Sequence, residues 1–136
     1  MASIREEFPV AASPEAVWSA LRDFGAVHER LARDFVVAAE DQGDARVVTF
    51  VNGAVAREVL VATDDEARRL VYSVVESPLG TTHHNASAQV LPDGEDGSRF
   101  VWITDVLPHE AATPIREMMA LGAVAIRQTL ETQVEQ

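Results

Sequence analysis

The stretch 13-SPEAVWSALRDF-24 decides the fold, because it marks the start of a helix directly after the first strand signal. Ser13 is suited to the N-cap, Pro14 to the first helical position, and Glu15 to the first turn, where the helix dipole favours an anion. Its apolar residues lie three or four positions apart and predict one apolar face: Val17, Leu21 and Phe24. A second short helix is expected at about 28–33.

Strand signals surround this helix. Residues 3–10 alternate loosely and predict a strand before it. Six runs with strand signals follow it, each closed by a turn: 35–40, 45–51, 54–63, 68–76, 83–91 and 98–107. The Asn-Gly pair at 52–53 is the strongest short hairpin signal. Because the turns between consecutive strands are short, they predict an antiparallel meander.

The segment 113-TPIREMMALGAVAIRQTLETQVEQ-136 predicts one long helix, with Thr113 as its N-cap and Pro114 at its first position. Apolar or small residues repeat at helical spacing: Ile115, Met119, Gly122, Ile126 and Leu130. A sheet must cover one face. We therefore expect an α+β fold in which a curled seven-stranded antiparallel sheet surrounds the C-terminal helix, with two short helices after the first strand. One helix does not fill so wide a sheet, so a cavity is expected between them.

The composition excludes several classes of function. The chain has 136 residues, which suits a single domain over 1–136, and it lacks cysteine, which excludes disulfides and thiolate zinc sites. All 11 basic residues are arginine, so Schiff-base chemistry on a lysine is excluded as well. A net charge of −11 argues against nucleic acid and anionic membrane surfaces as partners.

The sequence also indicates a compartment. It contains no run of about 18 apolar residues and does not begin in the manner of a signal peptide. We therefore expect a cytoplasmic protein. Abundant alanine and arginine without lysine is typical of GC-rich bacterial genomes. A homodimer is compatible with the sequence, and no cofactor is expected.

Four stretches resemble the SRPBCC superfamily, also called START-like or helix-grip proteins. They are 12-ASPEAVWSALRDF-24, 68-RRLVYSVVES-77, 97-GSRFVWITDVLP-108 and the terminal helix. The chain is most similar to the polyketide cyclase/dehydrase branch. This resemblance covers essentially the whole chain and implies an elongated apolar cavity between the sheet and the C-terminal helix, for hydrophobic or aromatic ligands. Because the branch includes cyclases, lipid carriers and hormone receptors, the fold alone does not determine the function.

Strand alternation selects the side chains that face this cavity. In 83–91 one set is wholly polar, and the other is small and apolar apart from its histidine: His84, Ala86, Ala88 and Val90. We place the second set inward, so that His84 enters the cavity and His83 faces water. The adjacent histidines therefore do not form a metal site. It stays open whether His84 transfers protons, which requires a pKa near neutrality, or is only a polar group of the lining.

The other candidates follow from the same alternation. Tyr72 can orient a carbonyl or donate a proton, and Trp102 can stack on a planar ligand. Either Glu58 or Arg57 faces inward, and an inward Glu58 is a candidate base. The candidate catalytic residues are His84, Tyr72 and Glu58. The candidate ligand-binding residues are expected to line the same interior: Trp18, Ala86, Ala88, Phe100, Trp102, Thr104, Met118, Met119, Gly122 and Ile126.

Two further positions carry expectations. Gly122 costs the helix about 1 kcal/mol relative to alanine, which indicates that a ligand or a nearby strand uses the space. The acidic turn at 64–66 is expected to be a solvated hairpin tip.

Three functions fit these observations. The first is an enzyme of the polyketide cyclase/dehydrase kind, which holds a carbonyl-bearing substrate in a near-attack shape and promotes aldol-type ring closure or loss of water. The second is a non-catalytic carrier or binding protein for a hydrophobic small molecule, and the third is a subunit that acts through a partner. Since no catalytic triad is visible, the sequence favours a cavity for an uncharged or weakly charged, planar hydrophobic molecule over any named reaction.

Overall fold

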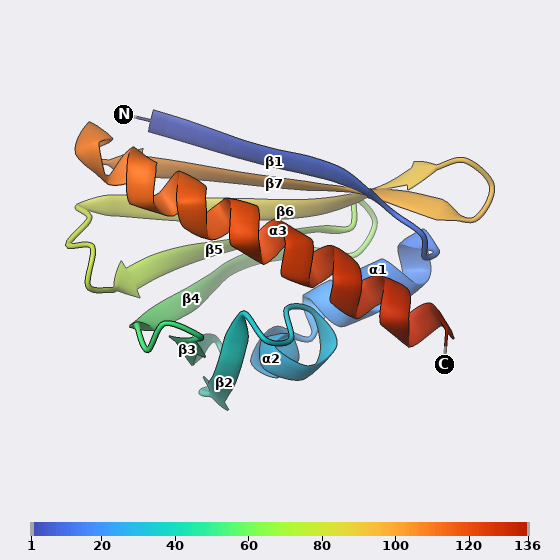
Figure 1. Cartoon of the computed structure of the whole chain (residues 1–136), viewed down its shortest axis with the longest axis horizontal. Helices are drawn as coiled ribbons and strands as arrows, with labels where there is room; N and C mark the ends of the chain where they lie inside the picture. Colours follow the sequence, from blue (N-terminus) through green and yellow to red (C-terminus); the bar gives the residue numbers. More distant parts are fainter. Residues whose placement is uncertain (1, 136) are drawn as a thin grey trace.

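The computed structural model describes residues 2–135. Its elements are β1 (Ala2–Val10), α1 (Pro14–Arg22), η1 (Phe24–Ala26), α2 (Val27–Arg30), β2 (Val36–Asp41), β3 (Ala45–Phe50), β4 (Val55–Asp64), β5 (Arg69–Glu76), β6 (His83–Asp93), β7 (Gly97–Leu107), η2 (His109–Ala111) and α3 (Ala112–Glu135). Figure 1 shows α3 running lengthwise across one face of the sheet. This is the α+β helix-grip arrangement that the sequence predicts.

The sheet is antiparallel throughout and open, with the strand order β1-β7-β6-β5-β4-β3-β2. Because β1 and β2 form opposite edges, the segment of α1, η1 and α2 carries the chain from one edge to the other. The pairing register shifts once between β2 and β3 and twice between β4 and β5. Such bulges bend a strand and increase its local right-handed twist.

The start of α1 is confirmed. The Ser13 side chain accepts a hydrogen bond from the Ala16 amide at 3.2 Å, and Pro14 is the first helical residue. The helix ends at Arg22, so the expected extension to Phe24 is wrong: Phe24 instead begins the 3₁₀ turn η1. The second helix is shorter than expected and occupies Val27–Arg30.

The predicted start of the long helix, Pro114, is wrong, because the helix begins at Ala112. The 3₁₀ turn η2 runs directly into α3, which begins at Ala112, so Thr113 is a helical residue and not the N-cap. Pro114 therefore lies third in the helix. It is tolerated there because the first four amides of a helix have no intrahelical acceptor.

The core lies between α3 and the sheet. The apolar face of α3 is buried as predicted at Ile115, Met119, Ile126 and Leu130. None of the helices within residues 2–135 is long and apolar enough to cross a membrane.

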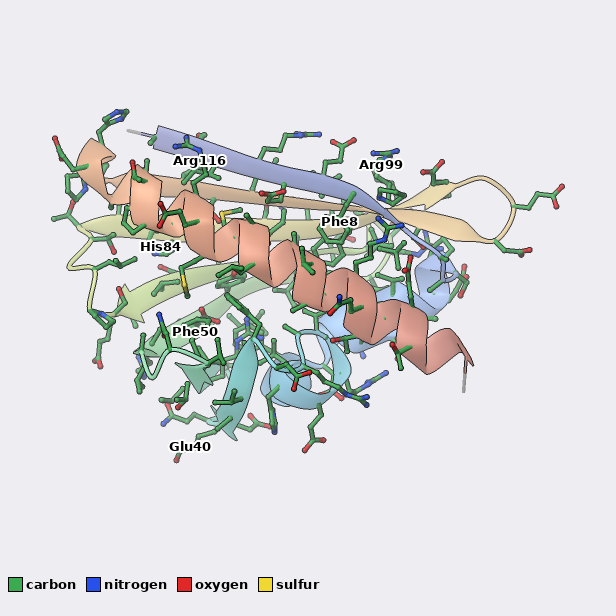
Figure 2. All side chains as sticks on the ribbon, viewed as in Figure 1. Phe8, Glu40, Phe50, His84, Arg99 and Arg116 are labelled. Carbon is green, nitrogen blue, oxygen red and sulfur yellow. The ribbon has the colours of Figure 1, made fainter. Side chains whose placement is uncertain are left out.

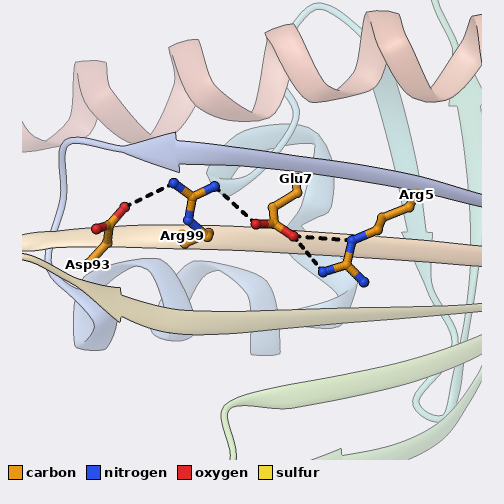
Figure 3. Close-up of polar contacts among 4 residues, drawn as sticks. All are labelled: Arg5, Glu7, Asp93 and Arg99. Atoms are coloured by element: carbon orange, nitrogen blue, oxygen red, sulfur yellow. Dashed lines mark hydrogen bonds and ion pairs between the residues drawn. The ribbon is translucent and has the colours of Figure 1, made fainter.

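The face of β1 on the solvent side of the sheet carries charged side chains. Figure 3 shows a chain of ion pairs in which Arg5 contacts Glu7, Glu7 contacts Arg99, and Arg99 contacts Asp93. The hydrogen bond from Arg5, assisted by Arg99, lowers the pKa of the Glu7 carboxyl. These contacts join β1, β7 and the end of β6 on the solvent side, away from the cavity.

Candidate functional site

A cavity of about 530 Å³ lies between the sheet and α3. Aliphatic and aromatic side chains form most of its lining. The exposed members of the lining mark where it opens, between the β3–β4 turn, the β5–β6 loop and the first half of α3: Asn52, Pro78, Leu79, Glu117 and Leu121. The expected cavity is therefore present.

An ion pair between β3 and β4 is the most polar feature of the cavity. Arg46 and Glu58 are each only 6% exposed, and both line the cavity. Nε and Nη2 of Arg46 both contact Oε1 of Glu58, at 2.8 Å. Oε2 of Glu58 takes no part in this pair, so it remains available as an acceptor.

The guanidinium of Arg46 is held on its other sides as well. Nη1 donates to the carbonyl oxygen of Phe24 at 2.9 Å. The guanidinium carbon lies 3.8 Å from the centroid of the Phe24 ring and 5.2 Å from that of Tyr72, a cation–π arrangement. Arg46 thus ties the end of the α1–η1 segment to the sheet and fixes the position of Glu58.

The question of which charge in β4 faces inward is resolved. Glu58 lies inside with Ala56, and Arg57 lies on the other face, where its side chain donates to Gln42. The carboxylate is ion-paired with Arg46, a contact that the sequence analysis does not predict.

Tyr72 and Trp102 form a hydrogen-bonded pair across the sheet. The indole Nε1 of Trp102 donates to the hydroxyl oxygen of Tyr72 at 3.2 Å. Tyr72 lies in β5, is 9% exposed and lines the cavity. Burial, together with the nearby Glu58 carboxylate, raises the pKa of Tyr72, so the phenol keeps its proton at neutral pH.

His84 comes from β6 and lines the cavity together with residues of the first half of α3, which crosses in front of it in Figure 2. Its face is assigned correctly, since Ala86, Ala88 and Val90 are buried at 3% or less. His83, expected to be exposed, is half-buried, as is His84. His83 lies opposite Leu107 in the pairing of β6 with β7.

The electrostatics of His84 limit its chemistry. Burial, assisted by the neighbouring His83, lowers the pKa of His84 from 6.5 to about 4. The imidazole is therefore neutral at pH 7 and does not meet the requirement of a pKa near neutrality. Its Nδ1 atom is buried without a hydrogen-bond partner among the described residues. A neutral imidazole of this kind can hydrogen-bond a bound molecule.

The space at Gly122 is used by aromatic side chains. A Cβ atom at this position would lie 3.0 Å from Cζ3 of Trp102 and 3.1 Å from Cε2 of Phe35. The glycine therefore lets α3 approach two rings, one from β7 and one from the loop before β2. It does not face the cavity directly.

The structure brings ten of the thirteen candidate residues into the cavity lining. They are Glu58, Tyr72, His84, Ala88, Phe100, Trp102, Thr104, Met118, Met119 and Ile126. Ala86, Gly122 and Trp18 lie outside the lining. Ala86 points to the same side of the sheet but is covered, at 3% exposure.

Trp18 has a structural contact elsewhere. Its Nε1 donates to Asp65 at 2.9 Å, and Arg22 contacts the same carboxylate oxygen at 2.9 Å. The acidic turn after β4 is therefore not simply solvated, because Asp65 anchors α1 to it.

Arg46 is a charged lining residue that the sequence analysis does not single out. Its strand reads as an ordinary apolar run, and an isolated arginine in such a run is usually solvated. The available signal was its position two residues from Val48 and four from Phe50, which places all three on one face of β3. Among the described residues, no group of three or more His, Asp or Glu side chains is arranged to hold a metal ion.

Comparison with known proteins agrees with this architecture. A family model described as "Polyketide cyclase / dehydrase and lipid transport" matches residues 1–135. The protein XoxI from Bacillus cereus shares 22% identity and a TM-score of 0.86, with 100% of this chain and 99% of that chain covered. No curated protein matches the chain.

Two further solved structures share the fold. Norcoclaurine synthase from Thalictrum flavum, solved in complex with dopamine and hydroxybenzaldehyde, has 22% identity and a TM-score of 0.76, covering 98% of this chain and 86% of that chain. A START superfamily protein from Mycobacterium smegmatis has 17% identity and a TM-score of 0.69, covering 98% and 97%. At these identities the likeness shows the fold alone.

Proposed function

We propose that this chain, which belongs to the family of polyketide cyclases, dehydrases and lipid-transport proteins, binds a small, uncharged hydrophobic molecule of aromatic or polyketide-like character. The cavity of about 530 Å³ between α3 and the sheet carries this proposal. Its size falls within the usual range for small-molecule sites, roughly 300–1,000 Å³, and its mostly apolar lining with few polar groups is typical of them.

The charges of the lining support an uncharged ligand. Arg46 is the one arginine among the described residues of the lining, and it forms an ion pair with Glu58. A carboxylate ligand would find no free counter-ion there, and burying an unpaired charge is costly. The ligands named with norcoclaurine synthase are also small aromatic molecules.

The test is titration of the chain with the neutral fluorescent probe N-phenyl-1-naphthylamine, with native mass spectrometry for stoichiometry. We expect saturable one-to-one binding with enhanced fluorescence. Ala88→Leu places extra volume in the cavity and should weaken binding at least tenfold. Ala120→Leu is the matched control, because Ala120 is exposed on α3 outside the lining. Equal loss in both variants, or no saturable binding, would refute the proposal.

A second candidate function is catalysis of aldol-type cyclisation or dehydration. It is favoured by Oε2 of Glu58 and the hydroxyl of Tyr72, two proton-handling groups in one apolar cavity. In this reading Glu58 accepts a proton from the carbon beside a carbonyl, and Tyr72 hydrogen-bonds the carbonyl oxygen as charge develops there. The neutral His84 contributes a hydrogen bond.

Catalysis is tested by incubating the chain with a linear aromatic β-polyketone and following cyclised or dehydrated products by mass spectrometry. Glu58→Gln should lower turnover about 100- to 10,000-fold while the probe still binds. If product forms equally well in Glu58→Gln, the proposed catalytic function is refuted, whereas the proposed binding function still stands.

A further inference from the structure

We propose that Trp102 is a positioning residue that makes the Tyr72 hydroxyl a hydrogen-bond donor for a carbonyl oxygen of the ligand. The inference rests on the proposed binding function and adds the class of ligand, which is a planar, uncharged molecule bearing a ketone or a similar carbonyl. It assigns distinct roles to two side chains that the alternation pattern alone treats as independent parts of the lining.

The direction of one hydrogen bond carries the argument. An indole N–H is a donor only, whereas a phenol can donate one proton and also accept. Because Nε1 of Trp102 donates to the Tyr72 oxygen at 3.2 Å, that oxygen is an acceptor in this pair. The phenolic proton must therefore point away from the indole.

That proton has no acceptor among residues 2–135. The one hydrogen bond of the Tyr72 side chain is the bond that it accepts from Trp102. Tyr72 is nevertheless nine-tenths buried, and it lines the cavity. A buried donor without an acceptor is unfavourable, so a bound molecule with an oxygen at this point would gain the missing hydrogen bond. Burial also keeps the phenol protonated at neutral pH, since it raises the pKa of Tyr72.

The indole is itself held in place. Its ring edge lies against Gly122, where an added Cβ would come within 3.0 Å of Cζ3, and Phe35 lies against the same glycine. Trp102 is therefore confined between α3 and Tyr72. This confinement fixes the N–H that orients the phenol.

The test compares two probes of the same shape, 9-fluorenone and fluorene, which differ only in a carbonyl against a methylene. One neutral hydrogen bond should make fluorenone bind about twofold to tenfold more tightly than fluorene. Tyr72→Phe should abolish this preference while leaving the affinity for fluorene unchanged. In infrared spectra, the carbonyl stretch of bound fluorenone should lie at lower frequency with the native chain than with Tyr72→Phe.

Trp102→Phe tests the positioning role, because it keeps an aromatic ring and removes the N–H. The phenol is then free to rotate, so the preference for fluorenone should shrink and the carbonyl band should broaden. Trp18→Phe is the matched control, since it removes the indole hydrogen bond to Asp65 outside the cavity lining and should preserve both preference and band.

The outcomes separate this inference from the proposed function. Equal affinities for the two probes, or a carbonyl band that Tyr72→Phe does not move, overturn the inference and leave hydrophobic binding intact. An unchanged preference in Trp102→Phe overturns the positioning role. If neither these probes nor the naphthylamine binds, the proposed function fails and the inference fails with it.

Discussion

Replacing Arg46 with methionine is expected to destabilise the chain strongly. Methionine keeps much of the length of the side chain but removes both contacts to Glu58 and the hydrogen bond to the Phe24 carbonyl. It leaves a carboxylate that is only 6% exposed without its partner. Breaking a buried ion pair by removing one member typically costs about 3–5 kcal/mol.

The assay is urea unfolding followed by circular dichroism at neutral pH. With an m-value of about 2 kcal/mol/M, a loss of about 3–5 kcal/mol lowers the midpoint by about 1.5–2.5 M. Glu58→Gln should cost less than Arg46→Met, because the amide oxygen still accepts from the guanidinium. The double variant should lose about 1–3 kcal/mol less than the sum of the two single variants, since the residues contact one another.

Arg127→Met is the control for a solvent-exposed ion pair. Arg127 is 51% exposed at the side chain and contacts Glu131 at 3.3 Å one turn along α3, so its loss should cost less than about 0.5 kcal/mol. If Arg46→Met behaves like this control, or if the two substitutions at the buried pair are additive, the reasoning that the pair is buried and coupled is refuted.

Three further predictions follow from single side chains. Gly122→Ala should leave the free energy of unfolding within about 1 kcal/mol, because the gain in helix propensity offsets the crowding of Trp102, but the displaced indole should weaken probe binding in a fluorescence titration. The pKa of His84 is lowered from 6.5 to about 4 in the folded chain. As the pH falls, the unfolded chain therefore binds a proton at this residue before the folded chain does, and this favours unfolding. His84→Gln should therefore remove about 2 kcal/mol of the stability loss measured by urea unfolding between pH 7 and pH 5. Asp65→Ala breaks the contact to Trp18 and should lower stability by about 1 kcal/mol in thermal unfolding, with no change in fluorene affinity.

Much of the fold could be predicted because its signals are local. Alternation in β6 assigns Ala86, Ala88 and Val90 to the interior, and the Ser13–Pro14 pair locates the start of α1. The start of α3 is harder to predict from the sequence. A 3₁₀ turn that continues into a helix leaves no cap residue to recognise, and Thr113, which the sequence predicts as the N-cap, lies inside α3.

The polar contacts of the cavity depend on register, and register depends on the length of a loop. A two-residue loop at Asn52 and Gly53 would place Arg46 opposite Val59. In the structure the loop has three residues, because the Phe50 amide bonds to the Ala54 carbonyl and Gly53 adopts a φ of 89°. The shift of one residue sets Arg46 opposite Glu58. An Asn-Gly signal predicts the hairpin but does not distinguish these two loops, so the ion pair could not be derived.

The contacts of Gly122 show that the volume of the cavity and the hydrogen bonding of Tyr72 depend on the same side chain, Trp102. A glycine within a helix indicated that something occupies the adjacent space, but only the folded chain identifies the occupants as the rings of Trp102 and Phe35. The same indole that forms a wall of the cavity donates to Tyr72. A substitution that moves Trp102 therefore changes both the volume open to a ligand and the direction of the phenolic proton. Gly122→Ala should accordingly reduce the preference for fluorenone over fluorene as well as the affinity for both, and a loss of affinity with the preference intact would show that the wall and the donor act independently.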